Sequence, residues 1–259
     1  MIYLRTMIKI IILGGGNVAY HLTNALLQIS AVNVVQVYNR SLEKINCFKN
    51  NTSITDNLSA LKEADIYILA VSDNAISELS SALNLKNKLV VHTSGSMALE
   101  ELKSVSNKGV FYLLQSFSKE RKIDFSTVPI CIEAKTDTDL RLLETLAKSI
   151  SKNCYEINSD QRKSLHLAAV FVNNFVNHLY HVGHEICEQN KVPFEILLPL
   201  IKETADKITT LSPFEAQTGP AKRNDTKTIE KHTAMLTKNQ QEIYTLLTKS
   251  IYDTHGKKL

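Results

Sequence analysis

Several residue types are scarce in this chain, and it has no long apolar run. Tryptophan is absent, and the 259 residues include only eight glycines, five prolines and four cysteines. No apolar run approaches the ~18 residues that a membrane-spanning helix needs, which excludes an integral membrane protein. The first apolar run covers only Ile10 to Leu13, too short for the ~7 to 15 residues of a signal-peptide core. We therefore expect a cytoplasmic protein with no membrane partner.

The cysteines and the charges exclude further classes of protein. The cysteines lie far apart and form no C-x-x-C pair, so we expect neither a metal site nor a disulfide framework. The 30 lysines and arginines against 26 acidic residues leave a net charge of +4, which gives no reason to expect a nucleic-acid partner. Hydrophobic residues make up 44% of the chain, enough for one large domain or two of roughly 150 residues.

The first part of the chain alternates strand and helix signals. Strand-like apolar runs occur at 8–13, 32–38, 65–71, 88–92, 128–133 and 154–157, and helical patterns at 17–29, 41–49 and 137–150. This alternation predicts an α/β fold with a parallel, doubly wound sheet. After Asn158 no convincing strand follows, and prolines punctuate helical stretches. We predict two domains, an α/β domain at 1–158 and an all-α domain at 159–259.

Three of the eight glycines fall together, between the first strand and the first helix. The sequence from Gly14 to Ala19 fits the pattern G-x-G-x-x-A. Gly14 allows a tight turn, and Gly16 lets a pyrophosphate approach the backbone N–H groups at the helix start, where Asn17 and Val18 lie. This context predicts a dinucleotide site. The alternative is an ordinary tight turn between a strand and a helix.

The end of the second strand indicates which dinucleotide binds. An NAD site places an acidic residue there, on the ribose 2′-hydroxyl. This chain instead has Asn39, Arg40 and Ser41 after Tyr38, and an arginine beside a hydroxyl suits a 2′-phosphate. We infer NADP(H), with a solvated surface arginine as the alternative.

Polar residues follow two later strands, at 71–74 and 92–96. Because ligands of open α/β sheets bind at the carboxyl ends of strands, these residues can bond the ribose or the nicotinamide. The candidates are Val71, Ser72, Asp73, Thr93 and Ser94. Alternatively, Asp73 and Ser94 only cap the helices that follow.

Twenty consecutive residues, Leu165 to His184, include no Asp, Glu, Lys or Arg. On a regular helix one side is apolar, and four polar residues lie on the other side, each within ~20° of the direction of His166: His166, Asn173, Asn177 and His184. Solvated helix faces are usually charged, so this neutral polar face is expected to turn toward a cleft or a subunit interface. The alternative is a plain outer face.

A basic turn lies between Gln217 and Thr226. Gly219 and Pro220 form the turn, Lys222 and Arg223 bring two cations, and Asn224 or Asp225 can cap the next helix. A cationic turn that leads into a helix N-terminus is a plausible anion site. A capped surface turn explains the pattern nearly as well.

Together these motifs resemble those of NADP-dependent oxidoreductases that join a Rossmann-like domain to an all-helical domain of unknown function. The motifs are ILGGGNVAYHL, LAVSDNAI, VVHTSGS, HLAAVFVNNFVNHLY and QTGPAKRNDTKTIEKH, and the resemblance covers nearly the whole chain. The layout is similar to that of pyrroline-5-carboxylate reductases and, more distantly, of β-hydroxyacid dehydrogenases. The resemblance implies a helical domain that serves substrate binding and dimerisation, and therefore a homodimer.

The sequence departs from the dehydrogenases at one position. They carry a lysine one helical turn before an asparagine, and if Asn174 is that asparagine, Val170 occupies the place of the lysine. The usual general acid is therefore missing. His166, one turn earlier, and His232, beside the basic turn, are the nearest titratable groups, and an imidazole titrates near neutrality.

Two functions follow from these observations. The first is an NADP(H)-dependent reductase of a small, anionic carbonyl or imine substrate held between the domains, with His166, Asn174, Arg223 and His232 as the candidate catalytic residues. The second is a non-catalytic NADP(H)-binding or sensing dimer. The missing lysine favours the second, and the basic turn and the polar helix stripe favour the first.

Overall fold

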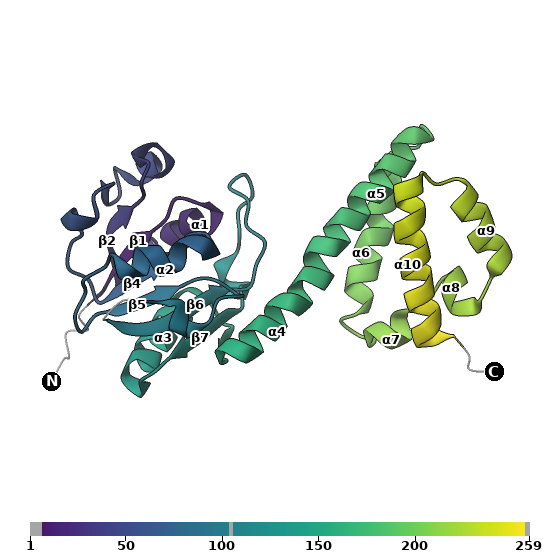
Figure 1. The fold of residues 1–259 in the computed structure, drawn as a ribbon. Helices are drawn as coiled ribbons and strands as arrows, with labels where there is room; N and C mark the ends of the chain where they lie inside the picture. Colours follow the sequence, from purple (N-terminus) through teal and green to yellow (C-terminus); the bar gives the residue numbers. More distant parts are fainter. Residues whose placement is uncertain (1–6, 104–105, 257–259) are drawn as a thin grey trace. The chain divides into compact units, whose positions relative to one another are not determined.

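The computed structural model describes residues 7–103 and 106–256 (Figure 1). The chain divides into two compact units, Met1–Asn173 and Asn174–Leu259, and each is described by itself. The boundary predicted at Asn158 coincides with the start of helix α4 (Ser159–Ala169), but this helix belongs to the first unit. The predicted limits of the two domains stay a prediction. Within the described residues, no helix is long and apolar enough to cross a membrane.

The described residues of the first unit form an eight-stranded sheet in the order β3-β2-β1-β4-β5-β6-β7-β8. The strands are β1 (Ile8–Leu13), β2 (Val32–Tyr38), β3 (Ser53–Thr55), β4 (Ile66–Leu69), β5 (Leu89–His92), β6 (Asn107–Leu113), β7 (Ile130–Ala134) and β8 (Cys154–Glu156). Neighbouring strands are parallel, except that β6 and β7 are antiparallel. The predicted α/β fold with a doubly wound parallel sheet is confirmed, with β6 and β7 as the one antiparallel pair among the described strands.

The antiparallel pair has a physical reason. A parallel connection needs a crossover, usually a helix, to carry the chain back along the sheet. The connection from β6 to β7 contains only the short 3₁₀ helix η4 (Phe125–Thr127), so β7 returns beside β6 in the opposite direction. Strand β6 itself was not predicted, because two polar residues and Gly109 interrupt its apolar pattern at the start.

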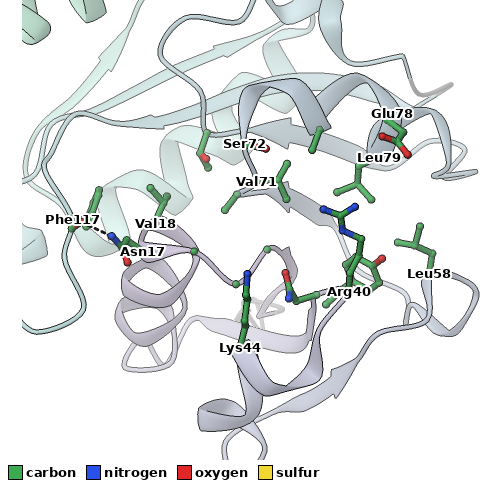
Figure 2. A pocket seen from close by; sticks show the side chains of 18 of the residues that line it. Asn17, Val18, Arg40, Lys44, Leu58, Val71, Ser72, Glu78, Leu79 and Phe117 are labelled. Carbon is green, nitrogen blue, oxygen red and sulfur yellow. Dashed lines mark hydrogen bonds between the residues drawn. The ribbon is translucent and has the colours of Figure 1, made fainter.

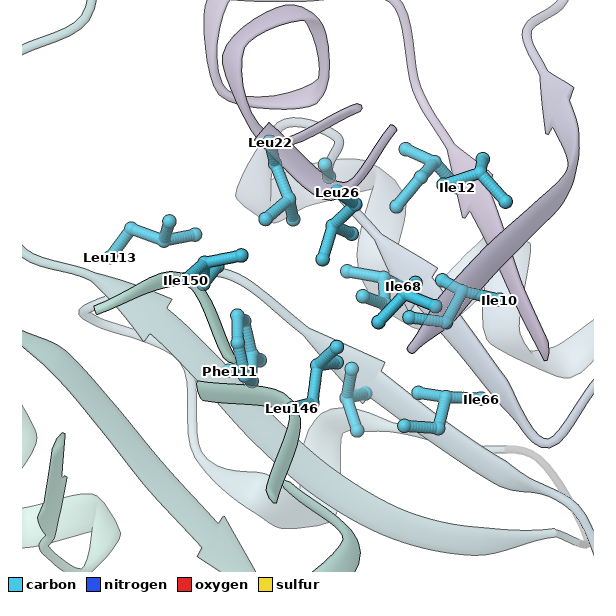
Figure 3. Close-up of a cluster of buried hydrophobic side chains, with 14 of the residues drawn as sticks. Ile10, Ile12, Leu22, Leu26, Ile66, Ile68, Phe111, Leu113, Leu146 and Ile150 are labelled. Atoms are coloured by element: carbon cyan, nitrogen blue, oxygen red, sulfur yellow. The ribbon is translucent and has the colours of Figure 1, made fainter. Parts of the chain in front are cut away.

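Helices α1 (Asn17–Leu26) and α3 (Asp137–Ile150) cover one face of the sheet, and α2 (Asp73–Ser81) covers the other. Figure 3 shows Leu22 and Leu26 of α1 and Leu146 of α3 gathered over the strand residues Ile10 and Ile12. On the opposite face, Ile11 and Leu13 pack with Ile76 of α2. Alternate residues of β1 thus enter two cores, which explains why the strand is apolar at both faces.

The described residues of the first unit include three further short 3₁₀ helices: η1 (Leu42–Phe48), η2 (Leu58–Ala60) and η3 (Leu99–Glu101). The first of them lies where the sequence predicted an α-helix at 41–49. It places Ile45 and Phe48 in the core beside β2.

The helical run that begins with α4 is not a regular α-helix. Asn158 caps α4 with a capping box, and α4 is followed by the π-helical segment η5 (Val170–Phe175) and by α5 (Val176–Gln189). A π-helix bonds residues i and i+5 and so has more residues per turn than an α-helix. The polar and apolar stripes expected from a regular 100° rotation therefore do not continue through η5, and that part of the prediction was wrong.

The described residues of the second unit include no strand, which agrees with the predicted all-α region. After α5 come η6 (Phe194–Leu197), α6 (Leu198–Lys207), α7 (Pro213–Ala216), α8 (Pro220–Arg223), α9 (Thr226–Ala234) and α10 (Lys238–His255). Among the apolar residues described in this unit, only Ala221 is buried. The unit therefore has very little hydrophobic core of its own.

Candidate functional site

A cavity of about 580 Å³ lies at the carboxyl ends of β1, β2, β4 and β5 (Figure 2). In the sheet, β1 lies between β2 and β4, and the order of the strands along the chain reverses there. Open α/β sheets bind ligands at such a point. The cavity lining includes most of the predicted cofactor-binding residues: Gly14, Gly16, Asn17, Val18, Asn39, Arg40, Val71, Ser72 and Thr93.

The glycine turn is shaped by the strands on both sides of β1. Gly14 has a φ of +145° and donates its N–H to the carbonyl of Tyr38 at 2.8 Å. A Cβ at Gly14 would lie 2.1 Å from the carbonyl oxygen of Ala70, so only glycine fits there. A Cβ at Gly16 would meet no atom within 4 Å, so the space beside it is open. This open space is where a ligand can approach the backbone.

The N-terminus of α1 faces this cavity without a capping side chain. Gly16 is the N-cap residue, and the first turn of α1 carries no acidic residue. The first N–H groups of a helix lack partners within the helix and carry the positive end of its dipole. An anionic group of a ligand can therefore bind at this end of α1.

Two cations line the cavity near the end of β2. Figure 2 shows the side chains of Arg40 and Lys44 extending toward the cavity. Lys44 belongs to η1 and lies so close to the glycine turn that a Cβ at Gly15 would be 3.0 Å from its Cβ. Neither cation takes part in an ion pair with another described residue. Arg40 was predicted from the sequence, but Lys44 was not, because it reaches the site only through the fold of η1.

The connection between β6 and β7 supplies another wall of the cavity. Phe117 and Gln115 line it, and the Asn17 side-chain amide donates to the Phe117 carbonyl at 2.8 Å, as Figure 2 shows. His21 Nε2 lies 2.8 Å from the carbonyl oxygen of Ser118. These contacts hold the connection against α1. Sequence analysis missed Phe117 and Gln115, because they lie about 100 residues from α1 in the chain.

Three of the predicted cofactor-binding residues do not line the cavity: Ser41, Asp73 and Ser94. The Ser41 carbonyl accepts a hydrogen bond from the Asn39 side chain, and the Asp73 carboxylate accepts one from Ser96. Ser94 Oγ accepts the backbone N–H groups of Ser96 and Met97, each at 3.1 Å. The capping alternative for Asp73 and Ser94 was wrong, because the N-cap of α2 is Ser72 and that of η3 is Ala98. A role of any of the three residues in cofactor binding stays a prediction.

His166 of α4 lies beside the loop that follows β5, all within the first unit. Its Nδ1 is 3.1 Å from the hydroxyl oxygen of Tyr112 on β6. A Cβ at Gly95 would be 2.6 Å from the same nitrogen, so the imidazole packs directly on the loop backbone. Thr93, two residues before Gly95, lines the cavity. The structure therefore brings His166 close to the loop that borders the predicted nicotinamide end.

Burial changes the pKa of the groups around His166. It raises the pKa of Tyr112 to about 12 and that of the Cys131 thiol to about 11. Burial, with the Arg162 guanidinium as a second cause, lowers the pKa of His92 to about 4. Near neutral pH the Tyr112 hydroxyl and the Cys131 thiol therefore keep their protons, and the His92 ring is uncharged.

The remaining predicted catalytic residues belong to the second unit. Asn174 lies in η5, and Arg223 is the last residue of α8. His232 Nδ1 lies 3.0 Å from the hydroxyl of Tyr244 on α10. Asp225 caps α9, and hydrogen bonds from Thr228 lower the pKa of its carboxyl. The N-terminus of α9 is therefore already occupied by a carboxylate, and the roles of Asn174, Arg223 and His232 stay predictions.

Comparison with known proteins relates each part of the chain to oxidoreductases. Residues 9–95 match the family model of coenzyme F420-dependent NADP oxidoreductases, and residues 128–251 match a domain of unknown function, DUF2520. A candidate NADP oxidoreductase from Bacteroides fragilis is 38% identical, with a TM-score of 0.88 over 96% of this chain and 99% of that chain. No curated protein matches the sequence.

More distant solved structures share the fold. A reductive aminase from Aspergillus terreus, crystallised with NADPH and ethyl levulinate, is 15% identical with a TM-score of 0.70, over 97% of this chain and 96% of its own. A 1-pyrroline-5-carboxylate reductase from Streptococcus pyogenes is 14% identical with a TM-score of 0.65, over 96% of this chain and 99% of its own.

Proposed function

The chain belongs to the family of NADP oxidoreductases that join a Rossmann-like domain to a DUF2520 domain, and from this premise we propose that it is an NADP(H)-dependent reductase of a small, anionic carbonyl or imine substrate. The observation that carries the proposal is the cavity at the glycine turn, with Arg40 and Lys44 on its lining. Its volume of about 580 Å³ is of the size that small-molecule and cofactor sites have.

The residues of the cavity fit NADP(H). The open space beside Gly16 and the uncapped N-terminus of α1 suit a pyrophosphate. Arg40 and Lys44 suit the 2′-phosphate, because a dianion gains most from charge-assisted hydrogen bonds. Ser72 and Thr93, at the ends of β4 and β5, are placed to bond the ribose or the nicotinamide amide.

When bound, the nicotinamide supplies a hydride, and the chain must then orient the substrate and deliver a proton. We assign the proton to His166, because it packs on the loop that carries Thr93 and an imidazole exchanges protons near neutral pH. Asn174 would orient the substrate, Arg223 would bind its anionic group, and His232 is the second candidate donor. These three assignments rest on the sequence.

We also propose that the protein is a cytoplasmic homodimer. The second unit buries so little apolar surface that its helices need a partner to cover them. A second copy presents the same apolar surface and satisfies this need symmetrically. Among the described residues of the unit, the exposed large apolar side chains are Phe175, Leu179, Tyr180, Val192, Ile196, Leu198, Leu200, Ile208, Leu211, Phe214, Met235, Leu246, Leu247 and Tyr252. The free state of all four cysteines fits a reducing compartment.

One observation favours a second candidate function, an NADP(H)-binding dimer without turnover. Val170, at the start of η5, stands where the dehydrogenases that this chain resembles carry a lysine. Without that lysine, a protein can keep its cofactor site and lose the proton transfer.

A substrate screen separates the two functions. The full chain is mixed with NADPH and with carbonyls, carbonyls plus amines, and a deazaflavin, and the absorbance of NADPH is followed. We expect oxidation with at least one small anionic substrate, and His166→Gln should lower kcat by roughly 10² to 10⁴ without changing NADPH affinity. Arg223→Ala should raise KM for the anionic substrate with kcat retained. NADPH binding without oxidation in every mixture would support the sensing dimer.

A further inference from the structure

Tyr112 and His166 form a partly buried hydrogen-bonded pair between the sheet and α4. Tyr112 is only 8% exposed, and on the same face of the sheet it packs with Val110 and Cys131. Its hydroxyl oxygen lies 3.1 Å from His166 Nδ1, and the two rings meet edge to face with centroids 6.0 Å apart. All of these residues belong to the first unit.

The loop after β5 closes the pair from a third side. A Cβ at Gly95 would lie 2.6 Å from His166 Nδ1 and 2.8 Å from Tyr112 Cζ, closer than real Cβ contacts come. Glycine is therefore required here for space, so that both rings can rest on the loop backbone. The imidazole is held by α4, β6 and this loop together, which leaves it little freedom to turn.

The surroundings decide which atom donates in this hydrogen bond. If His166 Nδ1–H donated to the phenol oxygen, the hydroxyl hydrogen of Tyr112 would need another acceptor, and no described residue provides one. If the hydroxyl donates to Nδ1, both groups are satisfied. The burial that raises the pKa of Tyr112 to about 12 also keeps the phenol protonated and able to donate.

The other nitrogen of the ring then carries the hydrogen. A neutral imidazole has one N–H, so an Nδ1 that accepts from Tyr112 leaves the hydrogen on Nε2. Nε2 makes no hydrogen bond to any described residue. We propose that Tyr112 is a positioning residue, which fixes His166 in the Nε2–H tautomer and directs this nitrogen to deliver the proton. The last step rests on the proposed reductase function.

The hydroxyl also balances the proton transfer. As Nε2 gives up its hydrogen, Nδ1 takes the hydroxyl hydrogen of Tyr112, so the ring stays neutral and the phenol is reprotonated from water afterwards. The charged and titratable groups near the pair are Cys131 on β7, which stays a thiol, the ion pair of Arg162 with Glu133, and the uncharged His92 at the end of β5. None of these can replace Tyr112 as the partner of Nδ1, because Tyr112 occupies that position.

The test measures the tautomer of His166 and needs neither cofactor nor substrate. The full chain is labelled with ¹⁵N-histidine, and long-range ¹H–¹⁵N spectra are recorded at about pH 8.5, where an ordinary imidazole is neutral. His166→Gln identifies the signals of His166. We expect unprotonated Nδ1 and protonated Nε2, and we expect Tyr112→Phe to lower this tautomer ratio about fivefold.

Tyr67→Phe is the matched control. Tyr67 is another buried tyrosine of the sheet, and its hydroxyl donates to the Lys62 carbonyl at 2.9 Å, in a separate hydrophobic cluster that does not include Tyr112. Its removal should leave the His166 signals unchanged. Protonated Nδ1 in the unaltered protein, or identical His166 signals in Tyr112→Phe, would overturn the proposal.

A kinetic cycle then separates this proposal from the reductase function. Once a substrate is known, Tyr112→Phe should lower kcat about tenfold without changing NADPH affinity. In the His166→Gln variant, the same substitution should lower kcat by less than about twofold. Equal losses in both backgrounds would mean that Tyr112 acts independently of His166. If no NADPH is oxidised at all, the reductase function fails while the tautomer result still decides the role of Tyr112.

Discussion

Gly14 and Gly16 of the same turn have different roles, and replacing each with alanine distinguishes these roles. Gly14→Ala combines a left-handed φ with a contact of 2.1 Å to the Ala70 carbonyl, so we expect it to lower the free energy of unfolding by roughly 3 kcal/mol or more. Gly16→Ala meets no neighbour and should cost less than about 1 kcal/mol, as an alanine at an N-cap does.

The effects of the two substitutions on NADPH affinity should follow the opposite order. Gly16→Ala should lower NADPH affinity by about tenfold or more, because its Cβ stands where the pyrophosphate approaches the backbone. Urea unfolding and NADPH titration of both variants provide the check. A Gly14→Ala protein as stable as the unaltered chain would contradict the geometry of the turn.

His92 makes stability depend on pH in a defined window. The pKa of this buried ring is lowered to about 4, whereas a histidine of the unfolded chain titrates near 6.5. Between these values the unfolded chain takes up a proton that the native chain does not, so stability is retained above about pH 6.5 and is lost as the pH falls toward 4. The expected loss is on the order of 3 kcal/mol.

Urea unfolding at a series of pH values measures this dependence. His92→Asn should flatten the slope of stability against pH in that window, because it removes the imidazole. The fold should persist, because an asparagine oxygen can still accept the Ser94 N–H that His92 Nδ1 accepts. His178→Asn, at an exposed position, should leave the slope unchanged. An unaltered slope in His92→Asn would show that other groups cause the dependence.

Single residues could be predicted where the chemistry is local in sequence. Gly14, Gly16 and Arg40 follow directly from a strand, a turn and the end of the next strand, and all three line the cavity. Lys44 and Tyr112 could not be found in this way. Lys44 needs the fold of η1, and Tyr112 meets His166 54 residues away only through the packing of α4 on the sheet.

At the scale of elements, β-branched runs predicted β1 and β2 with correct bounds. The apolar patterns of the short strand β3 and the interrupted strand β6 are too weak to predict a strand. Pairing with neighbouring strands sets their places in the sheet. The π-helical η5 also has no signal of its own in the sequence, because its valines, phenylalanines and asparagines occur in ordinary α-helices as well.

Helix α4 is joined to the sheet by a buried ion pair, which gives a prediction at this scale. The side chain of Arg162 is 1% exposed, contacts the Glu133 carboxylate of β7 and donates to the Met97 carbonyl at 2.5 Å. Arg162→Met leaves that carboxylate without its cation, and we expect it to lower the free energy of unfolding by about 3 to 5 kcal/mol.

Lys148→Met is the control for this change. It removes an exposed ion pair with Glu144 within α3 and should cost less than about 1 kcal/mol. Chemical denaturation of both variants checks the difference. Equal losses would mean that Arg162 does not hold α4 against the sheet.

At the scale of the whole molecule, the helical unit predicts a dimer. Its apolar side chains can leave water only against another surface, so folding and association should be coupled. Light scattering should give twice the chain mass of 29.0 kDa, and the melting temperature should rise with protein concentration. A monomer that persists at all concentrations, with a constant melting temperature, would refute this expectation.

The most direct measurement of the central claim is calorimetric titration of the full chain with NADPH and with NADH. We expect NADPH to bind at least about tenfold more tightly, a difference of about 1.4 kcal/mol, because Arg40 and Lys44 face a 2′-phosphate that NADH lacks. Arg40→Ala should remove most of this preference and leave NADH binding unchanged. Equal affinities for the two nucleotides in the unaltered protein would contradict the assignment of the cavity to NADP(H).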